Sequence, residues 1–205
     1  MGKKKKIPYT SSQTILLVGE GDFSFALCLA RKFGNARNIV ATSRDSRGSL
    51  EDMYSGVSEK LSELESLGCT VLHGVDVHTM AHHPVLQSKD FDRIVFNFPH
   101  SGFFDSENDR RQIKRHKKLV RGFFRNAIHI LGDKGQIHIT HKTSYPYSEW
   151  EIEDIAELEN LILVREEDFK FNCYPGYINK KGDGPNCNRT FTVGDCSTFM
   201  FKLGF

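Results

Sequence analysis

The stretch Thr14–Phe25, which reads TILLVGEGDFSF, joins a short apolar run to a glycine-containing turn and a second apolar segment. The run Thr14–Val18 is continuous rather than alternating, which is typical of a central parallel strand buried on both faces. From Phe23 to Phe33 apolar residues recur at helical spacing, and Gly34-Asn35 ends that pattern. The stretch therefore predicts a buried strand, a tight turn and a helix, the first step of a βαβ arrangement.

Strand and helix patterns alternate through the rest of the chain. Further strands are predicted at Asn38–Thr42, Cys69–His73, Phe91–Asn97, Gln136–Thr140, Leu161–Phe169 and Ser197–Lys202. Further helices are predicted at Ser58–Leu67, Asn108–Leu131 and Trp150–Asn160, with a turn at Gly132–Gly135 and a long loop at Asn172–Cys196. The alternation indicates a parallel sheet with helices on both faces, and the last two strands, with no helix between them, predict a hairpin. The expected fold class is α/β: a Rossmann-like, doubly wound, mostly parallel seven-stranded sheet with a C-terminal antiparallel hairpin.

Length and composition fit one globular domain. The chain has 205 residues, of which 39% are hydrophobic and 26% charged, a balance that excludes intrinsic disorder. No apolar run approaches the ~18 residues of a membrane helix, and no hydrophobic segment follows Met1–Lys6 as a secretory signal requires. The five cysteines lack paired spacing, which favours a reducing, intracellular compartment. We expect a flexible basic arm over residues 1–12 and a single, monomeric domain over residues 13–205.

Charged residues are unevenly distributed along the chain. Basic residues concentrate at its start and between Arg110 and Arg125, whereas acidic residues concentrate between Glu149 and Asp168. On the predicted helix over residues 108–131, a basic stripe lies opposite the apolar face: Lys114, Lys118, Arg121 and Arg125. Such a stripe can neutralise several phosphates, so we predict that it binds RNA. The other interpretation, two solvated helix faces of opposite sign, stays open.

The turn after the first predicted strand is a candidate nucleotide-binding element, with these residues: Gly19, Glu20, Gly21, Asp22, Phe23 and Ser24. Glycines there let the backbone turn tightly and approach a bound nucleotide at the strand ends. Phe23 stands where a third glycine would allow pyrophosphate to pack on the helix N-terminus, which argues against NAD and an oxidoreductase. An ordinary glycine-rich turn is the alternative.

Two carboxylates follow the next two predicted strands. Asp45 lies just past the second strand, where a carboxylate can accept hydrogen bonds from both hydroxyls of a ribose. Asp76 lies at the end of the third strand, where an acidic residue of methyltransferases usually sits by the adenine amino group. The alternatives are a surface Asp45 opposite Arg44 and an Asp76 that caps the following helix.

Asn97-Phe98-Pro99-His100, directly after the fourth predicted strand, resembles the Asn/Asp-Pro-Pro-aromatic element of methyltransferases that act on planar nitrogen. In that element the Asn oxygen and a neighbouring carbonyl accept hydrogen bonds from the target nitrogen, an aromatic ring stacks on the base, and proline fixes the turn. These four residues are the expected catalytic residues, and Asn97 also borders the cofactor. His100 is a candidate base, with a polar strand-end histidine of no catalytic role as the alternative.

Three stretches together resemble one family: Ile15–Phe25 (ILLVGEGDFSF), Ala41–Ser46 (ATSRDS) and Phe91–Gly102 (FDRIVFNFPHSG). They are similar to the eukaryotic large-subunit rRNA uridine-N3 methyltransferases and their relatives. The resemblance implies a class I methyltransferase fold, S-adenosylmethionine as donor, an rRNA uridine as acceptor and a nucleolar or nuclear location, with which the Lys3–Lys6 run is compatible. It places Gly19–Phe23 on the methionine and ribose side of the cofactor, Asp45 at the ribose, Asp76 at the adenine and Asn97–His100 at the acceptor base.

Other functions stay open at this stage. A non-catalytic RNA-binding or ribosome-assembly factor on the same scaffold would bind RNA without turnover. A methyltransferase acting on a protein or a small molecule would not need the basic stripe. A metal is not expected, because two groups of residues lack zinc-ligand spacing: His73, His78, His82 and His83, and Cys173, Cys187 and Cys196.

Overall fold

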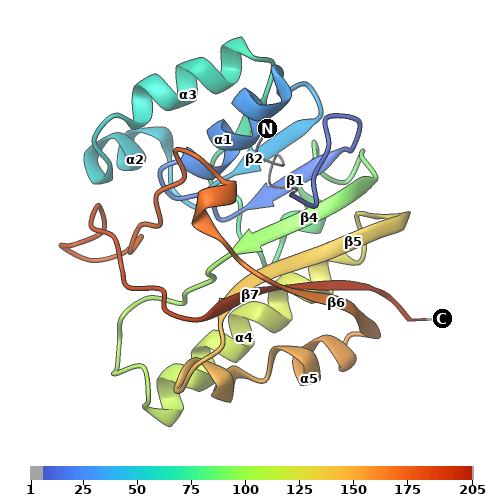
Figure 1. The fold of residues 1–205 in the computed structure, drawn as a ribbon, viewed down its shortest axis with the longest axis vertical. Helices are drawn as coiled ribbons and strands as arrows, with labels where there is room; N and C mark the ends of the chain where they lie inside the picture. The colour runs from blue at the N-terminus through green and yellow to red at the C-terminus, as the bar shows by residue number, and fades with distance from the viewer. Residues whose placement is uncertain (1–6, 205) are drawn as a thin grey trace, which may run out of the picture.

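The computed structural model of the chain describes residues 7–204, which fold around a seven-stranded sheet (Figure 1). The strands are β1 (Ile15–Val18), β2 (Ile39–Thr42), β3 (Thr70–Leu72), β4 (Phe91–Asn97), β5 (Leu131–Lys142), β6 (Leu161–Asp168) and β7 (Cys196–Leu203). Their order is β3-β2-β1-β4-β5-β7-β6, and β7 runs antiparallel to both of its neighbours. The predicted Rossmann-like, mostly parallel sheet with a terminal antiparallel hairpin is confirmed.

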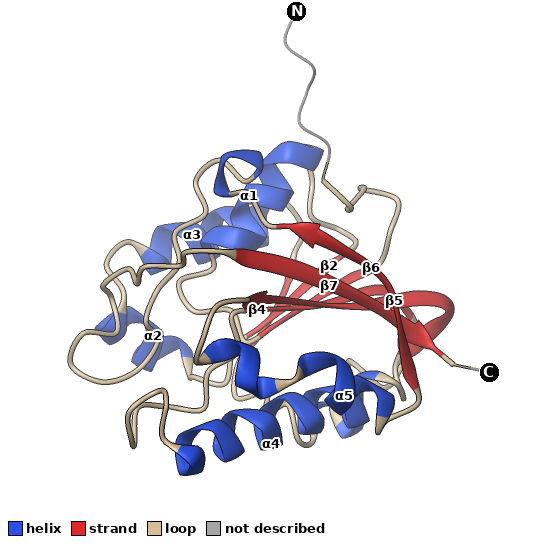
Figure 2. Ribbon diagram, turned by 60° about the horizontal axis from the view of Figure 1, so that its bottom comes forward, coloured by secondary structure: helices blue, strands red, loops and turns tan. Residues whose placement is uncertain are grey.

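Helices cover both faces of this sheet (Figure 2). On one side lie α1 (Ser24–Phe33), α2 (Arg47–Met53) and α3 (Val57–Ser66), and on the other α4 (Arg110–Ala127) and α5 (Ile152–Glu157). Short 3₁₀ turns occur at Met80–His82 (η1), Tyr147–Trp150 (η2) and Phe171–Cys173 (η3). Across residues 7–204, no helix has the length and apolar character that a membrane span needs.

The central strand β1 is buried on both faces, as its continuous apolar sequence predicts. Ile15 and Leu17 pack into the core under α1 and α3, whereas Leu16 and Val18 pack into the core that includes α4. The strand pairs in parallel with β2 on one side and β4 on the other. Its carboxyl end therefore lies beside theirs, at one edge of the sheet.

Two sequence predictions of local structure were wrong, and one helix was not predicted. Gly132–Gly135 is not a separate turn but an irregular part of β5, whose pairing moves from Phe91↔Leu131 to Arg93↔Gln136. The helix predicted over residues 150–160 is broken at Glu151, which has a left-handed φ of 51° and separates η2 from α5. The helix that was not predicted is α2, in which only Leu50 is buried, so its sequence has no apolar periodicity.

The first described residues are packed against the domain. Ile7 and Tyr9 are 8% and 4% exposed, and the Tyr9 ring lies edge-on to Phe25. His138 donates from Nε2 to Gln136, so its Nδ1 accepts the Tyr9 hydroxyl at 3.1 Å. Burial lowers the pKa of His138 to about 3, which keeps the ring neutral. The expected flexible arm is therefore wrong for residues 7–9, and residues 1–6 lie outside the described residues.

We predict that Tyr9→Ala lowers the free energy of unfolding by about 3 kcal/mol, since truncating a buried aromatic ring leaves a cavity. It would also leave Nδ1 of His138 without its donor. The exposed neighbour Thr10 provides the control, because Thr10→Ala should change stability by no more than about 0.5 kcal/mol. Denaturant unfolding measures both, and equal stabilities for the two variants would contradict the packing of this segment.

Candidate active site

A cavity of about 770 Å³, which we call the first cavity, lies at the carboxyl ends of β1, β2 and β4. Ligands of open α/β sheets bind at this edge, where the strand order reverses around β1. Part of its wall is the irregular segment of residues 174–195, which we call the late loop. The predicted cofactor residues that line this cavity are Gly19, Glu20, Gly21, Asp22, Asp45, Asp76 and Asn97. Phe23 and Ser24 lie behind them and do not line it.

The two glycines of the first turn keep the cavity floor open. Gly19 has a φ of +66°, and a Cβ atom there would lie 2.5 Å from the Phe96 ring. A Cβ atom on Gly21 would lie 3.2 Å from the hydroxyl of Tyr54, a cavity-lining residue. A side chain at Gly19 is thus excluded by both backbone conformation and space. The backbone amides of this turn can approach a ligand closely.

Asp22 and Ser24 hold the turn in place through hydrogen bonds, and their side chains present no unpaired polar group to the cavity. Asp22 accepts hydrogen bonds from the backbone N–H and hydroxyl of Ser24, at 3.1 and 2.6 Å. Its other oxygen pairs with Lys60 at 2.5 Å. The Ser24 hydroxyl also accepts the N–H of Ile178, which ties the late loop to the start of α1. Because both oxygens of the Asp22 carboxylate already have partners, we infer that Asp22 positions the turn and does not bind the cofactor through its side chain.

Glu20 is a carboxyl group at the cavity wall whose pKa is strongly perturbed. Burial raises the pKa of its carboxyl to about 8. The hydrogen bond from the Ala26 N–H acts in the opposite direction and lowers the pKa, but its effect is smaller. The nearby Asp22 carboxylate raises it further. In the free protein the group is therefore largely protonated at neutral pH, although a cation in the cavity would favour its ionised form.

Asp45 and Asp76 both line the cavity, but their carboxylates differ in hydrogen bonding. The carboxylate of Asp45 has no hydrogen bond or ion pair within residues 7–204, and Arg44 does not pair with it. It is free to accept two hydroxyl groups. Asp76 accepts the His78 N–H at 2.8 Å, so it stabilises its own turn while still lining the cavity.

The strand-end element Asn97–His100 separates the first cavity from a second one. Phe98 has a left-handed φ of 47°, an unusual conformation for a bulky residue, and its N–H donates to Thr140 at 2.8 Å. The side-chain oxygen of Asn97 is buried and has no donor among the described residues. Such an orphaned acceptor is costly unless a ligand supplies the donor.

The second cavity, of about 370 Å³, lies on the other side of Phe98. It shares Phe98, His100, Lys180, Lys181 and Phe191 with the first. Its remaining lining is aromatic and polar: Pro99, Phe103, Glu107, His141, Lys142, Tyr147, Trp150, Thr190 and Thr192. The four predicted catalytic residues therefore border two adjoining cavities.

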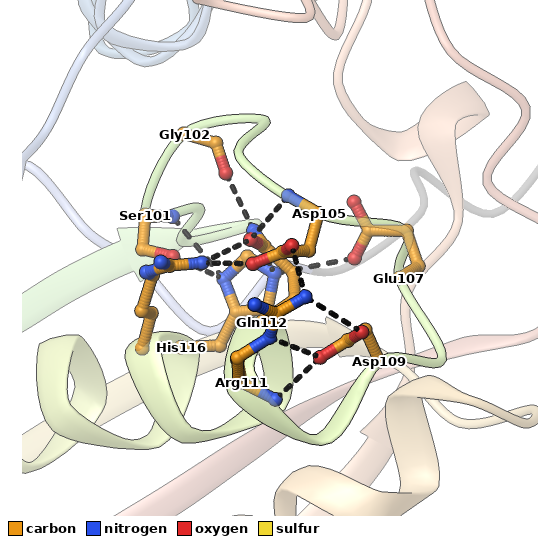
Figure 3. A network of polar contacts seen from close by, with 9 residues as sticks. Ser101, Gly102, Asp105, Glu107, Asp109, Arg111, Gln112 and His116 are labelled. Atoms are coloured by element: carbon orange, nitrogen blue, oxygen red, sulfur yellow. Dashed lines mark hydrogen bonds and ion pairs between the residues drawn. The ribbon is translucent and has the colours of Figure 1, made fainter.

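His100 belongs to a hydrogen-bonded network with Glu107 and His116 (Figure 3 shows the His116 part). The backbone N–H of Gly102 donates to Nδ1 of His100, and that of Ser101 donates to Nδ1 of His116. Each ring must then carry its proton on Nε2, where both face the Glu107 carboxylate, at 2.8 and 3.2 Å. Neither His100 nitrogen is free to accept a proton from a ligand.

The charge of this network resides on Glu107. Burial would raise the pKa of its carboxyl, but hydrogen bonds from His100 and His116 outweigh burial and lower the pKa to about 2. Burial also lowers the pKa of His116, which stacks on Trp150 with centroids 4.1 Å apart. One carboxylate held by two neutral rings is a fully paired arrangement.

The ligand atoms of His100, Glu107 and His116 lie within 4.8 Å of one another, as a metal site would require. A neutral imidazole that binds a metal through Nε2 carries its proton on Nδ1. Here both Nδ1 atoms face backbone N–H donors, which cannot accept that proton. The hydrogen-bonded network accounts for the cluster better than a metal does.

Comparison with known proteins places this geometry in a family. Residues 16–181 match the family BMT5-like, described as rRNA (uridine-N3-)-methyltransferase BTM5-like. The chain belongs to the BMT5-like family. Uncharacterized protein At4g26485 of Arabidopsis thaliana is 50% identical to it over 196 residues, covering 94% of both chains. The 25S rRNA (uridine(2634)-N(3))-methyltransferase of Saccharomyces cerevisiae is 23% identical, over 88% of this chain and 69% of that protein.

Solved structures support the fold of this BMT5-like protein. The glycopeptide N-methyltransferase MtfA superposes with a TM-score of 0.56, at 11% identity, over 94% of this chain and 87% of that one. The fold is thus the Rossmann-like fold of class I methyltransferases. This fold implies that the protein binds S-adenosylmethionine, and the open Gly19–Gly21 turn and the unpaired carboxylate of Asp45 in the first cavity fit that group.

The predicted basic stripe of this BMT5-like protein is divided in two. Arg121 and Arg125 face Glu159 at 2.6 and 3.6 Å, so the acidic segment neutralises that end. Lys114 and Lys118 are exposed and have no ion pair among the described residues, and Lys118 lines the first cavity. Free positive charge is therefore confined to the N-terminal half of α4, next to the site.

Sequence reasoning missed several lining residues that come from far along the chain. Tyr54 precedes α3, and Asn179–Asp183 and Phe191 belong to the late loop. The available signal in the sequence was the composition of that loop, which is rich in glycine and asparagine. The loop borders both cavities.

We predict that Glu20→Gln stabilises the free protein increasingly as pH rises. The folded-state pKa of Glu20 lies above its unfolded value, so folding opposes ionisation, and stability is lost between about pH 4.5 and pH 8. The gain from Glu20→Gln should be near zero at about pH 4 and about 1 kcal/mol or more at about pH 8. Denaturant unfolding at both pH values, with the exposed Glu59→Gln as control, measures it. A gain that does not depend on pH would refute this account of Glu20.

Proposed function

We propose that this protein is an S-adenosylmethionine-dependent RNA methyltransferase that transfers a methyl group to N3 of a uridine in large-subunit rRNA. The observation that carries the proposal is the junction of two cavities at Asn97–His100, one open to a nucleoside cofactor and one lined by aromatic rings. The family and the named activity of the yeast relative support uridine N3 as the target.

The first cavity would hold the cofactor through groups that are unpaired in the free protein. Asp45 would accept the ribose hydroxyls, and Asp76 would lie by the adenine amino group. The orphaned oxygen of Asn97 would receive an N–H from the cofactor or the acceptor. Glu20 would ionise in the presence of the positive sulfonium, which offsets the cost of burying that carboxyl.

Methyl transfer needs little from the protein beyond orientation, because the sulfonium methyl is already electrophilic. The strained turn at Phe98 and the fixed Pro99 would hold the acceptor nitrogen in line with the methyl group. The N3 proton of uridine must leave, and since both nitrogens of His100 are engaged, the proton passes to solvent rather than to His100. The earlier hypothesis of His100 as the base is therefore not retained.

The RNA would approach across the N-terminal half of α4. Lys114 and Lys118 supply charge there, and Phe103 and Phe104 are 51% and 68% exposed at the borders of the two cavities. Positive charge beside exposed aromatic rings suits a single strand whose bases stack outside a duplex. An rRNA substrate would place the protein in the nucleolus.

We predict that S-adenosylmethionine binds saturably in a calorimetric titration and that Asp45→Ala weakens binding at least tenfold, from the loss of hydrogen bonds to a charged group. Asp52→Ala, which removes an exposed carboxylate of α2, should bind as wild type does. Equal affinities for Asp45→Ala and wild type would show that the cofactor site is wrongly assigned.

On unmodified large-subunit rRNA, Asn97→Ala should lower the methylation rate about a hundredfold while the fold is retained, because Asn97 orients the acceptor. Incorporation of labelled methyl groups and digestion to nucleosides would identify 3-methyluridine. Cofactor and RNA binding without any methylation by the wild-type protein would favour a non-catalytic RNA-binding factor instead.

A further inference from the structure

The second cavity contains a lysine, Lys142, that has no ion-pair partner among the described residues. Lys142, at the end of β5, is two residues past Thr140, the β5 partner of Asn97. Its ammonium group lies 4.3 Å from the centre of the Tyr147 ring and 5.0 Å from that of Phe191, and it donates to the Tyr147 hydroxyl at 3.2 Å. It forms no ion pair within residues 7–204, although it is half-buried.

The groups around Lys142 leave the cavity positive. Lys180 and Lys181 line it from the late loop, while the carboxylate of Glu107 is held by His100 and His116. His141 is neutral, because burial lowers its pKa to about 4, and burial raises the pKa of the Cys196 thiol. Burial lowers the pKa of Lys142 as well, with Glu107 and Cys196 acting in the opposite sense.

Another donor in the same cavity lacks a partner. Trp150 lines the cavity and is 1% exposed, yet its indole N–H finds no acceptor among the described residues. Buried donors without acceptors are rare in folded proteins and call for a ligand that accepts. Lys142 and Trp150 together suit a flat ligand that carries carbonyl oxygens and tolerates, or bears, negative charge.

Resting on the proposed function, we propose that the second cavity binds the acceptor uracil as its N3-deprotonated imide anion, and that Lys142 selects this anion. The proton leaves N3 for solvent hydroxide, and its electron pair delocalises onto O2 and O4, where the ammonium group stabilises it. The N3 lone pair then forms the C–N bond while the S–CH₃ bond breaks with its electrons moving to sulfur. The products are neutral 3-methyluracil and S-adenosylhomocysteine.

The same charge disfavours the other pyrimidine. Cytosine has no N3 proton to lose, so methylation at N3 would create a cation beside Lys142 and the neighbouring lysines. Like charges at short distance in a half-buried site are unfavourable. Lys142 therefore discriminates by the charge of the reacting base, whereas Phe98 and Phe191 would accept the ring of either base.

The test measures nucleoside binding to protein saturated with S-adenosylhomocysteine, so that no turnover occurs. Trp150 is the single tryptophan of the chain, and its fluorescence reports on the second cavity. The probes are 6-azauridine, whose imide proton is more acidic than that of uridine, and 3-methyluridine, which has none. In wild type the affinity for 6-azauridine should rise about tenfold between about pH 6 and pH 9, and that for 3-methyluridine should stay constant.

Lys142→Met should reduce the rise to less than about twofold, and Lys142→Arg should restore it, which a purely structural role of the side chain would not explain. Lys134→Met, an exposed lysine at the other end of β5, is the matched control and should behave as wild type. Should Lys142→Met fail to fold, Lys142→Gln makes the same comparison.

The inference is overturned if wild-type affinity for 6-azauridine does not rise with pH, if neither nucleoside changes the fluorescence, or if Lys142→Met keeps the full rise. Binding of S-adenosylhomocysteine is recorded first in the same samples. Its absence would count against the proposed function, whereas a missing pH-dependent nucleoside response would count against the role of Lys142.

Discussion

The close approach of the Gly19 backbone to the ring of Phe96 is the contact on which both halves of the site depend. A Cβ atom at Gly19 would lie 2.5 Å from that ring, so the cofactor turn after β1 rests directly on β4. Phe96 in turn packs edge-on against Phe123 of α4, with centroids 5.2 Å apart. The residue after Phe96 is Asn97. One packing contact thus sets the distance between the cofactor turn, the strand-end element and the helix that carries Lys114 and Lys118.

The two cavities also differ in the charge of the ligand that each can accept. In the first cavity, the carboxyl of Glu20 can ionise and the carboxylate of Asp45 is unpaired, so both can supply negative charge to a cationic sulfonium. In the second, Glu107 is already satisfied by two imidazole N–H groups, and Lys142 is left without a counter-ion among the described residues. Under the proposed function, this arrangement would bring a cation and an anion together at Asn97–His100. Transfer of a methyl group between them would neutralise both.

The sequence was sufficient where structure depends on short-range pattern. The apolar run Thr14–Val18 and the glycines after it determine β1 and its turn, and the alternation of strands and helices determines the sheet, including its final hairpin. The predicted site residues that meet at the first cavity follow strand ends, because parallel strands end at a common edge. Long-range pairing was not readable: nothing local to Arg121 or Arg125 indicates that Glu159 lies against them. The same holds for the Ser101 N–H that occupies Nδ1 of His116, fifteen residues further along the chain.

The late loop forms part of the wall of both cavities, and hydrogen bonds hold it in place. Ser24 holds it at one end through Ile178, and Asn179 holds it through the carbonyl of Phe191 at 2.6 Å. Lys180 donates to Asn188 within the loop while its stem lines both cavities. Phe191 stands beside Phe98, with centroids 5.6 Å apart, and forms part of the wall between the two spaces. Since one segment lines both cavities, a cofactor that holds this loop in place from the first cavity would, under the proposed function, also fix the aromatic surface on which the acceptor base would stack.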